Sequence, residues 1–204
     1  MKLYKNIIIS IACHLVGLYA SEWIDMGSPR PSVPQWSVNS HSDSHIEISF
    51  DINGYYHTVL DNGKTRLSFP GGVPILEEGS PNLPLMARSI IIPDIANMSL
   101  TILDTEYIEI ELENVEPSKG NLTRDIDPSS VPYVYGNPYL LDEFYPSEIA
   151  FLRDPYILRS LRGQAVVFQP LQYNPIRNTL RIYSHIKIII KWMNYIIWFI
   201  CNSF

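Results

Sequence analysis

The short segment at residues 41–45 (HSDSH) has the spacing of metal ligands. In an extended chain, side chains two residues apart point to the same side, so those of His41, Asp43 and His45 would face together. Zinc accepts imidazole and carboxylate ligands, but a structural zinc site takes four of them. The sequence offers no fourth ligand nearby and the two serines favour a polar loop, so we predict no metal site here.

Catalysis by a cysteine requires a thiol beside an imidazole, together with donors for the oxyanion. The two cysteines, Cys13 and Cys201, lie close to the two ends of the chain. The five histidines occur in terminal or strand-like contexts that supply no such partner: His14, His41, His45, His57 and His185. We therefore predict that the chain is not an enzyme and uses no cofactor.

Two pairs of acidic residues have the composition of a general acid and base. They are Glu77 with Glu78, and Asp125 with Asp127. In segments rich in Pro and Gly, such residues more often cap turns or face solvent than transfer protons. We predict the structural role for both pairs.

Three segments carry an ordered series of Pro, Gly and Tyr landmarks. They are EEGSPNLPLMARSIIIP at 77–93, the Pro- and Tyr-rich stretch at 117–146, and RGQAVVFQPLQYNPIRNTLRIYSHIKIII at 162–190. Together they resemble the N-terminal propeptide of gingipain-type cysteine peptidases, over roughly residues 65–190. The resemblance depends on these landmarks and on no catalytic motif.

The resemblance implies a secreted prodomain that keeps a gingipain-like cysteine peptidase latent and assists its folding as an intramolecular chaperone. In zymogens of this type the prodomain covers the active site and presents a basic side chain to the specificity pocket. By resemblance, Arg124 is the inhibitory contact and Lys119 is second. The alternative is that both are ordinary solvated charges of a Pro- and Gly-bounded loop. The implied partner is the family's peptidase domain, which we expect to be absent from this chain.

Further landmark residues match the propeptide family: Glu78, Gly79, Pro81, Leu83, Pro84, Pro170, Tyr173, Asn174 and Pro175. We predict that they shape the backbone and bind no ligand. Proline fixes φ, glycine permits unusual turns, and asparagine bonds to nearby backbone.

A secreted carbohydrate-binding or adhesive β-sandwich module is the alternative function. Aromatic rings at the surface would stack on sugars, and the candidates are Trp36, Tyr55, Tyr56, Tyr133, Tyr135 and Tyr139. The formal net charge of −6 argues against general binding to nucleic-acid backbone or anionic lipid.

Apolar and polar residues alternate along several stretches, which is typical of strands with one buried face. The stretches are 46–52, 55–60, 65–69, 87–92, 98–112, 165–168 and 180–190. The last two flank the linker QPLQYNP and predict a β-hairpin, whereas 113–146 predicts a long loop packed on the domain. Because no stretch has a sustained helical period, we predict an all-β fold, a jelly-roll-like β-sandwich.

The two ends of the chain differ from the middle in composition. Residues 1–20 combine Lys2 and Lys5 with an apolar run that ends at Ala20, which predicts a signal peptide, with a membrane anchor as the alternative. We expect an irregular Ser- and Pro-rich leader at 21–44 and the propeptide-like β-sandwich domain at 45–191. The tail at 192–204 is atypical, and its composition indicates truncation or a shifted reading frame. The signal predicts a secreted or cell-surface protein with no membrane contact once the signal is removed.

Overall fold

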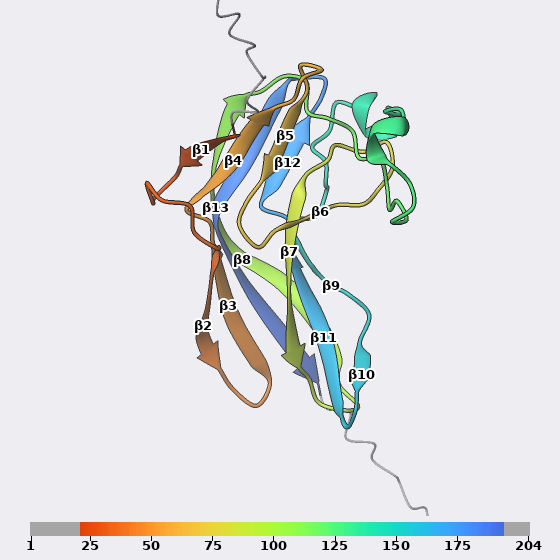
Figure 1. The fold of residues 1–204 in the computed structure, drawn as a ribbon. Helices are drawn as coiled ribbons and strands as arrows, with labels where there is room; N and C mark the ends of the chain where they lie inside the picture. Colours follow the sequence, from red (N-terminus) through yellow and green to blue (C-terminus); the bar gives the residue numbers. More distant parts are fainter. Residues whose placement is uncertain (1–20, 194–204) are drawn as a thin grey trace, which may run out of the picture.

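A computed structural model describes residues 21–193 of the chain (Figure 1). Regular structure in this range is almost entirely β-strand. The strands are β1 (Ser21–Asp25), β2 (Gln35–His41), β3 (His45–Asp51), β4 (Gly54–Val59), β5 (Thr65–Ser68), β6 (Val73–Pro74), β7 (Pro84–Ile91), β8 (Asn97–Glu111), β9 (Ala150–Leu152), β10 (Tyr156–Leu158), β11 (Leu161–Phe168), β12 (Leu171–Asn174) and β13 (Thr179–Met193). Two short 3-10 helices, η1 (Pro128–Ser130) and η2 (Asn137–Tyr139), lie between β8 and β9.

The longest strands, β8 and β13, form the spine of the first sheet. Strand β8 pairs antiparallel with one edge of β13. The other edge of β13 pairs with β12 near its start and with β3 further along, and β2 pairs with the far edge of β3. Alternate residues of β13 are fully buried: Leu180, Ile182, Ile186, Ile188 and Ile190. This is the period-two burial expected of a strand with one face on the core.

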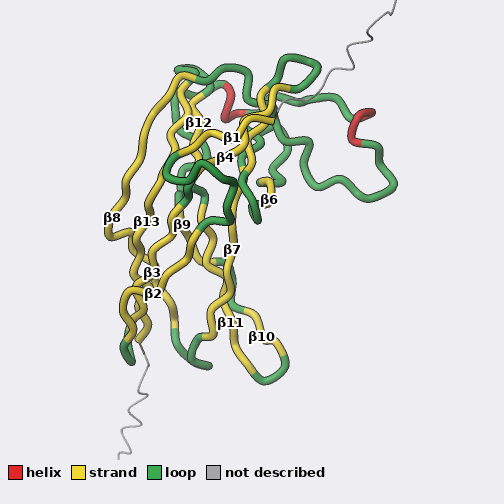
Figure 2. Tube along the Cα trace, turned by 60° about the vertical axis from the view of Figure 1, so that its left-hand side comes forward, coloured by secondary structure: helices red, strands yellow, loops and turns green. Residues whose placement is uncertain are grey.

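The second sheet has the order β10-β11-β7-β6, with β9 also paired to β11. It lies against the first sheet as a separate layer (Figure 2). At the centre of the interface the ring of Phe168 from β11 stacks on that of Phe50 from β3, with 4.6 Å between centroids and 7° between planes. The indole of Trp36 packs edge-on against the same Phe168 ring. Aromatic pairs of this kind contribute beyond the area that they bury.

A third sheet, β1-β4-β5, lies at the upper end of Figure 1, beside β12. Tyr55 of β4 and Leu67 of β5 are buried in the same hydrophobic core as the two larger sheets. The prediction of an all-β sandwich is therefore confirmed. Between residues 147 and 160 the chain forms the two short strands β9 and β10.

The predicted hairpin between the 165–168 and 180–190 runs is wrong in its pairing. Strand β11 pairs with β7 and β9 in the second sheet, whereas β13 pairs with β12 in the first. The hairpin that does form joins β12 to β13. Between β11 and β12, Pro170 accepts a hydrogen bond from the amide of Tyr183 (2.8 Å) as the chain passes from one sheet to the other. Alternation identifies a strand with a buried face, but both inner faces of a sandwich have it, so it cannot identify the partner.

The predicted irregular leader at 21–44 is also wrong, because it contains two strands. β1 pairs with β4, and β2 pairs with β3. Residues 26–34 and 42–44 lack regular structure, and the three prolines of the segment all lie in 26–34. Pairing with a neighbouring strand outweighed the low strand propensity of serine-rich sequence.

The predicted signal peptide at 1–20 and residues 194–204 of the predicted tail lie outside the described residues. Trp192 and Met193, which the prediction assigned to the tail, continue β13. No helix within residues 21–193 is long and apolar enough to cross a membrane.

The first prediction concerns the core. Leu180→Ala removes a side chain that is 0% exposed, and we expect the full chain to lose about 2–5 kcal/mol of unfolding free energy through lost burial and the remaining cavity. Leu140→Ala makes the same change at a side chain that is 73% exposed and should cost less than about 1 kcal/mol. Urea unfolding followed by tryptophan fluorescence measures both. Equal losses would contradict the assignment of Leu180 to the core.

Candidate functional site

The long excursion between β8 and β9, residues 112–149, is anchored by a buried carboxylate. Glu116 is only 1% exposed. Its side chain accepts hydrogen bonds from Nε and Nη2 of Arg66, from Nδ2 of Asn82 (2.8 Å) and from the hydroxyl of Tyr133 (2.8 Å). Burial alone would raise the pKa of this carboxyl. The hydrogen bonds and the charge of Arg66 outweigh burial, and they lower the pKa of Glu116 below its ordinary value.

Backbone hydrogen bonds fix the chain on both sides of Glu116. Its amide donates to the carbonyl of Thr65 (2.9 Å) and its carbonyl accepts from the amide of Asn82 (2.9 Å). One step further, the amide of Ser118 donates to the carbonyl of Ser80 (2.7 Å). The start of the excursion is therefore held between β5 and the landmark segment that precedes β7.

Gly79 permits a close approach between two loops. It has a φ of +81°, and its carbonyl accepts a hydrogen bond from the amide of Gly136 (2.8 Å). A Cβ on Gly79 would lie 3.0 Å from the nitrogen of Gly136. Both the conformation and the contact require glycine at position 79, which accounts for the Glu-Gly landmark in structural terms.

The far end of the excursion is held by the landmark residues of β12. Tyr145 and Tyr173 exchange two backbone hydrogen bonds, of 3.0 and 2.7 Å. The side chain of Asn174 donates to Asp142 (2.8 Å) and accepts from the amides of Ile176 and Arg177. These contacts fit the predicted structural role of Tyr173 and Asn174, and the excursion packs on the domain as the sequence predicted.

Lys119 closes the neck of a smaller loop within the excursion. Its Nζ donates to the carbonyl of Pro128 (2.6 Å) and lies 4.4 Å from the centre of the Tyr133 ring. On the exit side, Asp127 caps η1 by accepting hydrogen bonds from the amide (2.8 Å) and the hydroxyl (2.6 Å) of Ser129. The ammonium group of Lys119 is thus already bound within its own domain.

Arg124 lies at the tip of the loop that Lys119 closes. It is exposed, in a turn in which the amide of Ile126 donates to the carbonyl of Thr123 (3.1 Å). Within residues 21–193 its guanidinium has no hydrogen bond or ion pair. The structure therefore separates two side chains that the sequence treated alike: Lys119 binds its own domain, and Arg124 faces solvent.

The histidines and cysteines considered for metal binding or catalysis either have structural contacts or lie outside residues 21–193. His45 bonds Ser42 in the turn between β2 and β3 (2.7 Å), and His185 contacts Asp51 (2.6 Å). In the described part of the chain no group of three or more His, Cys, Asp and Glu side chains could hold a metal ion. Cys13, His14 and Cys201 lie outside that part.

The aromatic side chains proposed for sugar stacking are largely engaged. Tyr55 is buried in the core, and Trp36 packs on Phe168. The hydroxyl of Tyr139 donates to the carbonyl of Val115 (2.8 Å). These three rings contribute to packing. Tyr135 is more open: it is 51% exposed and packs edge-on against Tyr139.

Comparisons with known proteins point to one family. The family profile described as Propeptide_C25 matches residues 28–195. The chain is 35% identical to gingipain R1 of Porphyromonas gingivalis over 191 residues, 93% of this chain. It is 39% identical to gingipain R2 of P. gingivalis strain ATCC 33277 over 161 residues, 78% of this chain. It spans only 19% and 22% of the length of these two relatives.

Solved structures share the fold. The chain is similar to a complex of the P. gingivalis RgpB pro- and mature domains at 37% identity, with a TM-score of 0.72 over 79% of this chain and 86% of that chain. It is also similar to a structure concerned with the zymogenic latency of gingipain K, at 23% identity and a TM-score of 0.72, over 86% of this chain and 100% of that one. At 23% identity the second likeness concerns the fold alone.

The second prediction tests the anchor. Arg66→Met leaves the buried carboxylate of Glu116 without its cation, and we expect a loss of about 2 kcal/mol of unfolding free energy. A fully buried pair would cost more, but the Arg66 side chain is 51% exposed and water can replace part of its contact. Arg177→Met breaks the exposed pair with Asp142 and should cost less than about 1 kcal/mol. Denaturant unfolding at pH 7 compares them, and a cost for Arg177→Met as large as that for Arg66→Met would refute the anchor.

The third prediction concerns acid. Because the folded-state pKa of Glu116 lies below its ordinary value of 4.5, its stabilisation is present above that value and is lost as the pH falls through the folded pKa. Glu116→Gln cannot titrate, so its unfolding free energy should fall less steeply than that of the parent between about pH 5 and pH 3. Glu111→Gln, at an exposed position on β8, should keep the parent's slope. Parallel slopes for the parent and Glu116→Gln would show that Glu116 does not contribute.

Proposed function

The chain belongs to the C25 propeptide family, and on that basis we propose that it keeps a gingipain-type cysteine peptidase latent by placing the 117–132 loop in the active-site cleft. Family membership makes it a non-catalytic prodomain, as the sequence predicted. The observation that carries the proposal is the guanidinium of Arg124, which lies at the tip of an anchored loop and has no hydrogen bond or ion pair within residues 21–193. A relative at 37% identity has been solved as a complex of pro- and mature domains, which supports a peptidase domain as the partner.

The loop has the properties expected of a pseudo-substrate. Its base is fixed by Glu116 and its neck is closed by Lys119, so much of the ordering has taken place before a partner binds, and less conformational entropy is lost on association. The guanidinium is planar and always charged, and it can make two parallel hydrogen bonds to a carboxylate. Arg124 would supply that group to a specificity pocket that contains a carboxylate.

Lys119 is the second candidate for the inhibitory contact. To enter a pocket it would have to leave both the carbonyl of Pro128 and the ring of Tyr133. Arg124 would lose no such contact within residues 21–193 on entering a pocket. Arg124 is therefore the first candidate for the inhibitory contact. Lys119 contributes to inhibition through the shape of the loop.

We also propose that the protein is secreted, and we propose limits for its propeptide domain. Residues 1–20 are proposed as a signal peptide, which would place the protein outside the cell or on its surface. The propeptide domain, which includes β1 and β2 because these strands pair with β4 and β3, is proposed also to assist folding of the peptidase. N-terminal sequencing of secreted material should begin near Ser21. Intact Met1 in a membrane fraction would count against the signal.

The fourth prediction tests the inhibitory contact. The full chain, added in trans, should inhibit mature gingipain R2 of P. gingivalis. Arg124→Ala should weaken inhibition by about 2 kcal/mol or more, roughly thirtyfold, because it leaves a pocket carboxylate desolvated and unpaired. Lys119→Ala should weaken inhibition less, roughly threefold, because it loosens only the neck. Inhibition constants from hydrolysis of an arginyl peptide substrate measure both.

Circular dichroism of each variant controls for folding. If the two single variants and the double variant are folded and inhibit as strongly as the parent, the pseudo-substrate proposal fails. Any latency would then come from steric cover alone.

A further inference from the structure

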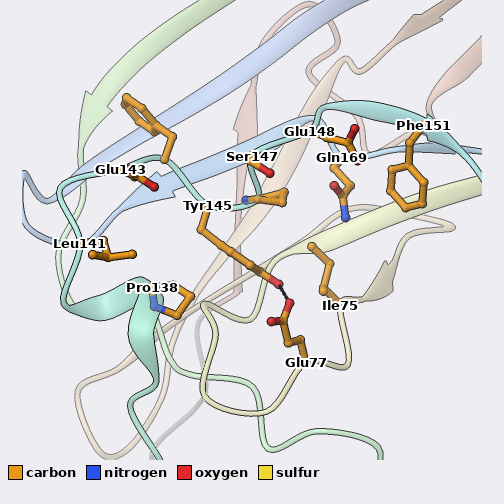
Figure 3. A pocket seen from close by; sticks show the side chains of 12 residues that line it. Ile75, Glu77, Pro138, Leu141, Glu143, Tyr145, Ser147, Glu148, Phe151 and Gln169 are labelled. Atoms are coloured by element: carbon orange, nitrogen blue, oxygen red, sulfur yellow. Dashed lines mark hydrogen bonds between the residues drawn. The ribbon is translucent and has the colours of Figure 1, made fainter. Parts of the chain in front are cut away.

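A pocket of about 450 Å³ lies beneath the second half of the excursion, apart from the tip of the 117–132 loop. Its walls come from the segment before β7, from η2, from residues 141–148, from β9 and from Gln169 just after β11 (Figure 3). Ile75, Leu141, Phe144 and Phe151 supply apolar surface. In Figure 3 Tyr145 crosses the middle, with Glu148, Gln169 and Phe151 on one side.

Three carboxylates line this pocket, and none is paired with a cation in the described part of the chain. Glu77 accepts one hydrogen bond from the hydroxyl of Tyr145 (2.7 Å), whereas Glu143 and Glu148 have no partner among residues 21–193. The guanidinium of Arg181 stacks on the ring of Phe144 at 3.9 Å but is paired with a different carboxylate, Glu109 (2.6 Å). Among residues 21–193, therefore, no carboxylate of this pocket forms an ion pair.

Gln169 is the observation that indicates a ligand. The residue is only 6% exposed, and its side-chain amide points into the pocket toward Ile75 (Figure 3). Its backbone amide is bonded to the carbonyl of Ile149 (2.8 Å), but its side chain has no hydrogen-bond partner within residues 21–193. The polar atoms of this side chain are open to the pocket rather than enclosed by protein, so their hydrogen-bond partner is water or a ligand that occupies the pocket.

The arrangement suits an extended organic cation better than a metal ion. No group of three or more carboxylates, imidazoles or thiols in the described range could hold a metal. Aromatic walls favour a planar guanidinium, which stacks on rings and donates five hydrogen bonds, over a compact ammonium. We propose that this pocket binds the arginine side chain of a protein segment, with the guanidinium between Glu148 and Glu77 and in contact with the amide of Gln169.

This proposal does not depend on the inhibitory role of Arg124. It concerns a different part of the excursion, an acidic pocket that receives an arginine rather than a basic tip that provides one. The arginine could belong to a separate protein or to a second copy of this chain. The chemistry of recognition is the same for both sources.

The test uses the full chain, labelled with ¹⁵N, and titrates it with N-acetyl-arginine amide followed by NMR. We expect a dissociation constant on the order of 1 mM, with shifts concentrated at residues 75–77, 143–151 and 169. N-acetyl-citrulline amide has nearly the same shape but no charge, and it should bind at least tenfold more weakly, on the order of a charge-assisted hydrogen bond.

Variants locate the site. Glu148→Gln changes an exposed carboxylate, so the chain should fold normally, and it should weaken arginine binding about fivefold. Gln169→Leu should also weaken binding, whereas Glu111→Gln on β8 should leave it unchanged. Equal binding of the arginine and citrulline probes, or shifts that avoid the pocket, would overturn the proposal.

Sedimentation of the chain alone distinguishes the two sources of arginine. A dimer that Glu148→Gln dissociates supports the site and assigns the arginine to a second copy. A monomer that binds the probe supports the site and assigns the arginine to a separate protein. A dimer that Glu148→Gln leaves intact, with no probe binding, refutes the pocket.

Discussion

The burial of the Glu116 carboxylate is the constraint on which the loop architecture depends. A carboxylate removed from water must be met by donors and a compensating charge, or it becomes protonated. Here the donors come from Arg66 in β5, Asn82 before β7 and Tyr133 within the excursion. Because all of them must reach one carboxylate, three segments that are distant in sequence are held at one point. The loop that carries Arg124 extends from this fixed point.

The sandwich supplies the rigid base for that anchor. Strand β5, which carries Arg66, belongs to the small third sheet, and its Leu67 is buried in the common core. The stack of Phe50 on Phe168 joins the two larger sheets beneath. A displacement of β5 would move Arg66 away from Glu116, so the packing of the core and the position of the loop are coupled. This coupling explains how an exposed loop whose regular structure is one short 3-10 helix, η1, can hold a defined shape.

The sequence predicted the strands better than their partners. Alternation located the buried residues of β13, but it could not show that β11 and β13 belong to different sheets, because both have a buried face. Nothing local distinguishes Glu116 from the exposed Glu113 three residues earlier. The donors to Glu116 lie 17 to 50 residues away, so its burial depends on tertiary contacts. The structural roles of Gly79 and Asn174 could be predicted because glycine and asparagine have specific uses in the backbone. The residues that they contact could not be predicted from the sequence.

Charged residues on the excursion fall into two groups. Those that have a partner within the domain hold the structure, and those that have none among residues 21–193 are available for recognition. Glu116 and Lys119 are bonded within the domain, whereas Arg124 and Glu148 have no partner among the described residues. The unsatisfied groups have opposite signs at two places, a basic tip and an acidic pocket, on one anchored segment. A partner that engaged both would have to offer a carboxylate at one position and an arginine at the other. Reversing its orientation would place like charges together, which is strongly unfavourable. Two contacts of opposite sign on a rigid segment would therefore set the orientation of the bound partner as well as its affinity.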